Sequence, residues 1–259
     1  MATKKKPGTA MVRWDEELAK AAQEQASSER AAGNFFSVRG GQLSYQGKPI
    51  KGGSMTVVVV DYVLENHWFA ESEFDPDNPQ SPTCFAFGRK DEDMAPHAEV
   101  TEAQSESCAK CPKNVFGSAV KGRGKACKNI RRLALIPSDA LDGGIEDAEI
   151  GFLRLPVTSC KGWSEYVTKL RDVIKRPTWA VVTRIDVQPH KQNQVEVTFT
   201  LEEKVGNEHL QALKDKCEAT AKVIELPYAK NVAREKPAAR ARSTPKGGVK
   251  KTGTRKAKF

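Results

Sequence analysis

One segment, 108-CAKCPKNVFGSAVKGRGKACKN-129, constrains the fold of this chain more than any other. It contains three cysteines, two of them separated by only two residues, together with six lysines and arginines and no acid. It closes an irregular region of about 40 residues that follows a short predicted strand at 83–90 and shows neither helix nor strand periodicity. Inside a compact domain, a stretch of that length needs its own source of order.

The cysteine spacing predicts that this source is a metal ion. Cys108-x2-Cys111 is a knuckle spacing that lets two thiolates bind one ion, and Cys127 follows within the range of two-part zinc sites. A structural Zn²⁺ needs four ligands, so we expect Cys84 to supply the fourth, with His97 as the alternative. An iron–sulfur cluster would also use four cysteines, and reduced thiols that pack as small apolar groups would need no metal.

The chain carries no recognisable catalytic motif. The run 117-GSAVKGRGKA-126 resembles a phosphate-binding loop, but the Lys-Ser/Thr step that would hold Mg²⁺ is absent. His190 and His209 have no evident catalytic partner in the sequence. We therefore expect a protein that is not an enzyme. A zinc-assisted nuclease is the weaker alternative, because four sulfur ligands leave no open position for water.

Charge is segregated along the chain. Residues 230–259 contain eleven Lys/Arg and one acid, and subtracting that +10 from the total of +9 leaves −1 for the rest. Residues 110–132 form a second basic block with eight Lys/Arg and no acid, whereas residues 65–106 contain eleven acids and two basic residues. This pattern is typical of a protein that presents a positive face to an anion.

Strand patterns dominate the middle of the chain. The run 54-SMTVVVVDYVLE-65 predicts a buried strand, residues 161–176 predict an amphipathic helix, and residues 178–204 predict a hairpin. A small barrel whose strands are interrupted by one helix is the order of an OB-fold. Cys160 and Cys217 lie beside or on helical apolar stripes and are assigned to packing.

These patterns predict a mainly β fold with flanking helices, an OB-fold-like barrel with a zinc-binding insertion. The predicted parts are a basic arm and helix (1–33), the OB-like domain (34–228) with its insertion at about 84–128, and a disordered basic tail (229–259). No apolar run reaches the roughly 18 residues that span a bilayer, and the N-terminus lacks the apolar stretch of a signal peptide. We expect a cytoplasmic protein without a membrane partner.

Basic and aromatic side chains near the cysteines suit a single-stranded nucleic acid, whose phosphates pair with cations and whose bases stack on rings. A bound metal would hold such groups in place. The predicted contacts are the aromatic residues Trp68, Phe69, Phe85 and Phe87 and the basic residues Arg89, Lys113, Lys121, Arg123, Lys125, Lys128, Arg131 and Arg132.

Several runs together carry a resemblance to a known family. They are 35-FFSVRGGQLSYQGKPI-50, TVVVVDYVLENHWF, SPTCFAF, the CAKC and GRGKACKN runs, and TSCKGWSEYVTKL with PTWAVVTRI. Over about residues 35–205 this order resembles bacteriophage single-stranded DNA-binding proteins. In functional plan the chain is also similar to the zinc-containing single-stranded DNA-binding proteins of T-even phages, which combine an OB-fold with a zinc subdomain. Those proteins use one His and three Cys, and the usual phage binder ends in an acidic tail where this chain is basic.

The residues and the resemblance together predict a non-catalytic, sequence-tolerant single-stranded DNA-binding protein of phage DNA replication or recombination. Zn²⁺ bound by Cys84, Cys108, Cys111 and Cys127 would brace a basic lobe beside an aromatic-lined groove. Partners would be single-stranded DNA and phage replication or recombination proteins. The alternative is a zinc-ribbon adaptor that binds a host or phage protein.

Overall fold

The computed structural model describes residue 18, residues 34–70, 81–190 and 194–225, and residue 228. The chain divides into two units, residues 1–229 and 230–259, and the second lies wholly outside the described residues. The predicted arm, helix and tail at 1–33 and 229–259 also lie outside them, apart from Leu18.

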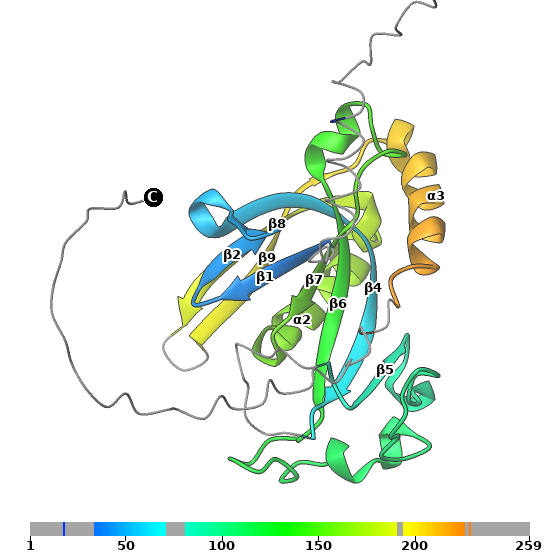
Figure 1. The fold of residues 1–259 in the computed structure, drawn as a ribbon. Coiled ribbons are helices and arrows are strands. Elements are labelled where there is room, and N and C mark those ends of the chain that lie inside the picture. Colours follow the sequence, from blue (N-terminus) through cyan, green and yellow to red (C-terminus); the bar gives the residue numbers. More distant parts are fainter. Residues whose placement is uncertain (1–17, 19–33, 71–80, 191–193, 226–227, 229–259) are drawn as a thin grey trace, which may run out of the picture. The chain divides into compact units, whose positions relative to one another are not determined.

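The first unit is built on one curled sheet that forms a half-barrel (Figure 1). Its strand order is β3-β2-β1-β7-β6-β4-β8-β9, and β5 pairs with the far end of β4. All of these pairings are antiparallel except β1 with β7, which is parallel. The strands are β1 (Phe35–Arg39), β2 (Gln42–Tyr45), β3 (Lys48–Pro49), β4 (Ser54–Trp68), β5 (Cys84–Gly88), β6 (Lys128–Pro137), β7 (Gly151–Leu155), β8 (Val181–His190) and β9 (Gln194–Lys204).

Helical segments lie between the strands. The α-helices are α2 (Cys160–Lys169), which continues into the π-helical turn η7 (Leu170–Ile174), and α3 (Leu210–Ala221). The 3-10 turns are η1 (Lys51–Gly53), η2 (Asp91–Asp93), η3 (Cys108–Lys110), η4 (Pro112–Asn114), η5 (Ser138–Asp142), η6 (Val157–Ser159), η8 (Thr178–Ala180) and η9 (Asn207–His209). Within the described residues, no helix is long and apolar enough to cross a membrane.

The valine run of β4 explains why both faces of the sheet are covered. Successive strand side chains point to opposite faces, so Val57 and Val59 pack in one core while Val58 and Val60 pack in the other. Helix α2 covers the concave face, where Trp163 is buried. Helix α3 covers the convex face through Leu213. The prediction of a mainly β class with flanking helices is therefore confirmed, and so is the assignment of Cys160 and Cys217 to packing, because both lie against these cores.

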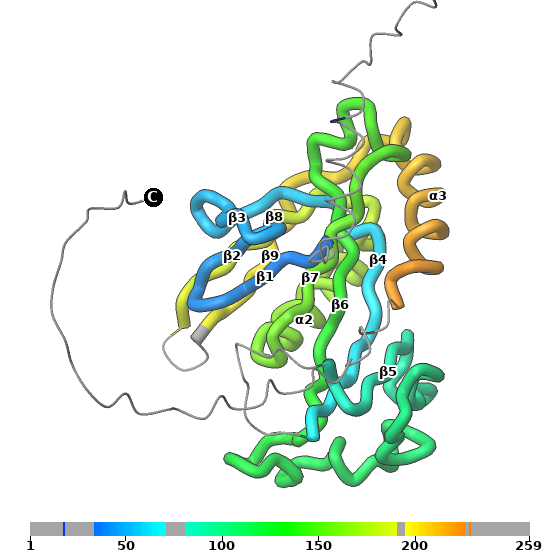
Figure 2. Tube along the Cα trace, viewed as in Figure 1, coloured from blue at the N-terminus to red at the C-terminus, as the bar shows by residue number. Residues whose placement is uncertain are grey.

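The strand count is higher than the sequence indicated. Residues 35–50 form three short strands where two were expected, since a turn at Gln46–Gly47, both with positive φ, separates β2 from β3. Strand β4 runs on to Trp68, beyond the expected end at residue 65. Figure 2 shows the segment between β5 and β6 gathered beside that end of β4.

Candidate functional site

The end of β4 places Cys84 and Cys127 near each other. Strand β5 pairs with one edge of β4 so that Cys84 lies opposite Trp68. Strand β6 pairs with the other edge, where Lys128 lies opposite His67, and Cys127 directly precedes that strand. Two cysteines separated by 42 residues in the sequence are therefore held by adjacent strand ends.

Two short turns carry the other two cysteines. Cys108 begins η3, its backbone N–H donating to Met94 O at 2.9 Å, and Cys111 follows that turn. The Cys127 N–H donates to Lys113 O at 2.8 Å, which ties the turn after Cys111 to the start of β6. These backbone bonds hold the irregular segment against the sheet.

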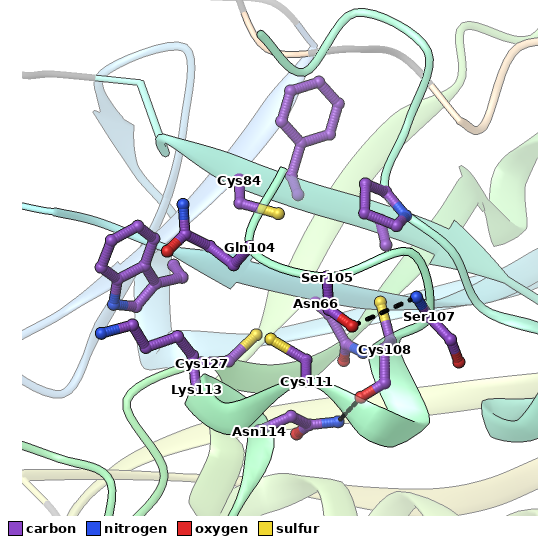
Figure 3. Close-up of a pocket in the computed structure, with 14 residues that line it drawn as sticks. Asn66, Cys84, Gln104, Ser105, Ser107, Cys108, Cys111, Lys113, Asn114 and Cys127 are labelled. Carbon is purple, nitrogen blue, oxygen red and sulfur yellow. Dashed lines mark hydrogen bonds between the residues drawn. The ribbon is translucent and has the colours of Figure 1, made fainter. Parts of the chain in front are cut away.

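All four predicted ligands line one pocket, the cysteine pocket, defined by Cys84, Cys108, Cys111 and Cys127 (Figure 3). In the close-up the sulfurs of Cys111 and Cys127 point toward each other and Cys84 lies across from them. Burial raises the pKa of the Cys84, Cys108 and Cys127 thiols, and the neighbouring thiols raise it further, to about 12 at Cys127. Thiols raise one another's pKa in this way only when their sulfurs lie close together.

The pocket gathers thiols without forming a closed coordination shell. Among the described residues, no group of three or more His, Cys, Asp or Glu side chains is arranged to hold a metal ion. The alternative ligand His97 is not among the residues that line the pocket, and its ring stacks on Phe85 at 5.1 Å instead. Of the two candidates for the fourth ligand, the fold thus brings Cys84 to the other three cysteines.

A chain of polar side chains braces the pocket from the sheet side. Asn129 Nδ2 donates to Asn66 Oδ1 at 2.6 Å, and Lys125 Nζ donates to Asn129 Oδ1 at 3.0 Å and to Asn114 Oδ1 at 3.1 Å. Asn114 Nδ2 in turn donates to Cys108 O at 2.9 Å. Lys125 is thus held between the turn η4 and the first residues of β6, whereas the sequence assigned it to DNA contact alone.

Residues 115–126 form a surface loop, the basic loop, that projects beside the pocket. Gly117 and Gly122 have φ values of 88° and 84°, a left-handed conformation that glycine adopts without strain. The Gly117 N–H donates to Arg123 O and Gly124 O at 3.1 and 3.0 Å, which closes the loop on itself. Phe116 and Val120 are 78% and 83% exposed, so the loop presents apolar as well as cationic groups to solvent.

Three of the twelve predicted DNA contacts lie on this loop, and Lys113 and Lys128 flank it in the sequence. Lys113 Nζ lies 4.9 Å from the centre of the Trp68 ring, a cation–π contact at the edge of the pocket. Phe69 is 40% exposed. The predicted cations Lys121, Arg123 and Lys128 are exposed, Arg131 is half-buried, and Phe87 is half-buried in the adjoining strand.

Three of the predicted contacts require correction. Arg132 and Phe85 are buried, with 0% and 5% of their surfaces exposed, so neither can meet DNA in this conformation. Arg132 faces the convex side of the sheet because Leu133 next to it faces the concave core. Arg89 is exposed, but its guanidinium is engaged by both carboxylate oxygens of Asp61 at 2.5 and 2.6 Å.

A charged cluster on the convex face, the Glu65 cluster, was not indicated by any pattern in the sequence. The fully buried carboxylate of Glu65 accepts a 2.7 Å hydrogen bond from Arg132 Nε and lies 3.2 Å from Arg154 Nε. The Tyr228 hydroxyl also hydrogen-bonds to Glu65 Oε1. Burial raises the pKa of this carboxyl group, but the hydrogen bond and charge of Arg132 outweigh it, so the net pKa lies below its ordinary value. Tyr228 is separated from Glu65 by 163 residues, so no local pattern could have linked them.

Compared with known proteins, the chain matches no protein-family model, no curated protein and no solved structure.

Proposed function

We propose that this protein binds single-stranded DNA without sequence preference and without catalysis. The observation that carries the proposal is the position of the basic loop, which is anchored at both ends by turns and strands of the cysteine pocket. Exposed cations together with an exposed ring at Phe116 are the two groups that single-strand binders combine. Fixing them on a braced loop lowers the entropy that binding would otherwise cost.

The strand pairings support an OB-fold arrangement. Strands β4, β6, β7, β8 and β9, with α2 between β7 and β8, supply five strands and one intervening helix in the OB order. Strand β4 pairs with both β6 and β8, β6 pairs with β7, and β8 pairs with β9. The barrel is open because β7 pairs with β1 on the side where an OB barrel would close. In OB proteins, oligonucleotides bind to the face of strands 2 and 3 and to the loop between strands 1 and 2. Those elements correspond here to β6–β7 and to the β4–β6 connection that holds the basic loop.

The cysteine pocket fits Zn²⁺ in the number and kind of its donors. Four thiols from three separate chain segments line one pocket, and four sulfur ligands form a common structural zinc site. A bound Zn²⁺ would stabilise thiolates that burial disfavours. Cys84, Cys108, Cys111 and Cys127 would hold the ion, and its role would be to fix the basic loop. A role in DNA replication or recombination rests on the phage resemblance alone.

A salt series tests the proposal. We expect full-length protein to bind labelled oligo-dT more tightly than a duplex of equal length, with an affinity that falls steeply as salt rises. Equal affinity for both, or an affinity indifferent to salt, would rule the proposal out. Replacing both Lys121 and Arg123 by Gln should weaken binding, whereas the same change at Lys161 and Lys169 on α2 should not.

A zinc-ribbon adaptor that binds a protein is the second candidate. The exposed apolar side chains of Val115, Phe116 and Val120 favour it, because apolar groups grouped on one loop also suit a protein interface. A pull-down with residues 1–228 separates the two functions. The adaptor should retain one protein partner and show little affinity for DNA.

A further inference from the structure

The Tyr228 ring occupies a well-defined place on the convex face of the sheet. Its centre lies 4.5 Å from the Arg154 guanidinium carbon and 5.1 Å from the Phe85 ring centre, at an interplanar angle of 62°. Its hydroxyl bonds to Glu65. The surrounding groups come from β4, β5 and β7, whereas Tyr228 lies beyond α3 in the chain. A planar ring is therefore held by a cation, a second ring and a hydrogen-bond acceptor.

The same groups match what a nucleobase needs. Bases stack on arginine guanidinium planes and on aromatic rings, and they are held by hydrogen bonds to their polar edges. The Phe35 ring lies 4.4 Å from the Arg154 guanidinium carbon, so that guanidinium already contacts two rings. Glu65 is an acceptor, and each of the four common bases carries an N–H donor on its pairing edge.

Two features would allow another ring to replace Tyr228 at this place. The Arg154 side chain is 36% exposed, so one wall of the ring site reaches solvent. Its Nε is buried and, among the described residues, has no hydrogen bond of good geometry. Tyr228 has no acceptor directed at that Nε, whereas a base carbonyl oxygen could accept from it. The buried pair of Glu65 and Arg132 beneath would remain in either state, because it does not depend on the tyrosine.

We infer that the ring site of Arg154, Phe85 and Glu65 binds a nucleobase of single-stranded DNA, and that Tyr228 occupies it in the free protein and competes with the base. The inference rests on the proposed function and adds a base-binding place outside the basic loop, together with its internal competitor. It also accounts for a tyrosine held by Arg154 of β7, one of the two strands that correspond to an oligonucleotide-binding face. DNA that enters the ring site must displace the tyrosine, so binding and release of Tyr228 are coupled.

The test compares oligo-dT affinity of the full-length wild type, Tyr228→Ala, Arg154→Ala and Val223→Ala at one salt concentration. Tyr228→Ala removes the competitor and should raise the affinity for oligo-dT about tenfold. This is the change expected when the base no longer has to displace roughly one stacking contact and one hydrogen bond. Arg154→Ala should weaken binding. Val223→Ala removes an exposed apolar side chain that also follows α3 and should change nothing. Circular dichroism melting of each variant checks that it is folded.

Modification of Tyr228 provides a readout independent of stability. Nitration by tetranitromethane, located by mass spectrometry, should increase at Tyr228 when oligo-dT is added to the wild type. If the wild type binds oligo-dT but Tyr228→Ala binds no more tightly and nitration is unchanged, the inference is wrong and the proposed function stands. If neither protein binds, both fail. Binding by Tyr228→Ala alone would support complete blockage of the site by the tyrosine.

Discussion

Asn129 on β6 is hydrogen-bonded to Asn66 on β4, with Nδ2 2.6 Å from Oδ1, at the point where the sheet meets the cysteine pocket. Asn66 is only 3% exposed, and its own Nδ2 donates to the Met94 sulfur at 3.6 Å. The pair therefore satisfies a buried amide and, through Lys125, carries the connection on to Asn114.

Replacing Asn129 by Ala should lower the free energy of unfolding by about 2 kcal/mol. The substitution leaves the buried Asn66 carbonyl oxygen without its donor and deprives Lys125 of one acceptor. Urea unfolding of the full chain measures the effect. Lys128→Ala, a change at the exposed neighbouring residue, should stay within about 0.5 kcal/mol of the wild type. An equal effect of the two substitutions would contradict this role for the pair.

The two cations Arg123 and Lys125 should behave differently although both lie in the basic loop. Arg123 is exposed, so Arg123→Gln should weaken oligo-dT binding and reduce the slope of log affinity against log salt by about 0.7, without altering the melting temperature. Lys125→Gln should instead lower stability, because Lys125 joins Asn114 to Asn129. Fluorescence titrations at several salt concentrations, paired with melting curves, distinguish the outcomes. A reversed pattern would mean that the loop charges are wrongly assigned.

Phe116 should contribute to binding by stacking. Phe116→Ala should cost about 1–3 kcal/mol of oligo-dT binding free energy, the usual loss for one base–aromatic stack. Val120→Ala in the same loop is the matched control, because Val120 is at least as exposed but has no ring. Equal losses at both positions would favour an apolar protein interface over base stacking.

Metal analysis addresses the cysteine pocket directly. The purified wild type should contain one zinc per chain by plasma mass spectrometry, and Cys84→Ser should reduce that content severalfold. His97→Ala should retain zinc, since His97 packs on Phe85 outside the pocket. Cys217→Ser serves as the control, because this thiol lies on α3 and packs against the core of the convex face. Removing zinc with a chelator should speed proteolysis within residues 115–126. Full zinc content in Cys84→Ser would exclude Cys84 as a ligand.

Acid should destabilise the fold in two steps. Burial lowers the pKa of His67 from 6.5 to about 4, with the charges of Arg154 and Lys128 adding to the effect while Glu65 opposes it. The unfolded state therefore binds more protons between those values, and stability should fall by about 3 kcal/mol as pH drops from 7 to 4. The lowered pKa of Glu65 adds a further loss below its unfolded value of 4.5.

Unfolding free energies measured between pH 7 and 4 check this expectation. His67→Gln should flatten the upper part of the curve, because glutamine does not titrate. If the wild-type curve is already flat above pH 4.5, His67 is not the group responsible.

The sequence predicted elements whose cause is local. The valine run of β4 predicts a strand through its β-branched content and continuous apolarity, and this strand is present and runs on to Trp68. The Trp163–Tyr166 stripe of α2 predicts a helix through its periodicity, and this helix is present. The sequence also predicted that four cysteines lie together. This prediction rested on the knuckle spacing and on the need of a long irregular segment for a source of order. Cys84 rather than His97 reaches the pocket because it begins a strand opposite Trp68, a pairing that spacing alone does not specify.

Side-chain partners distant in the sequence could not be predicted. Arg131 and Arg132 are adjacent and chemically identical, and strand alternation requires only that they point to opposite faces. Glu65, 67 positions away, determines that Arg132 is the buried one. In the sequence, Lys125 is indistinguishable from the other cations of the loop. Only the structure shows that its ammonium group donates to Asn114 and Asn129. Tyr228 could not be placed for the same reason, because its partner Glu65 lies 163 positions earlier in the sequence.

Strand β4 joins the half-barrel to the cysteine pocket. Its first residues pair with β8, its last residues pair with β5, and β6 runs along the opposite edge from Val57 to His67. Hydrogen exchange at the backbone around the cysteine pocket and in the half-barrel should therefore report one cooperative unit. A peptide of residues 84–128 would lack both Asn66 and Trp68, which line the cysteine pocket, so we expect that the pocket cannot be transplanted as a free-standing module.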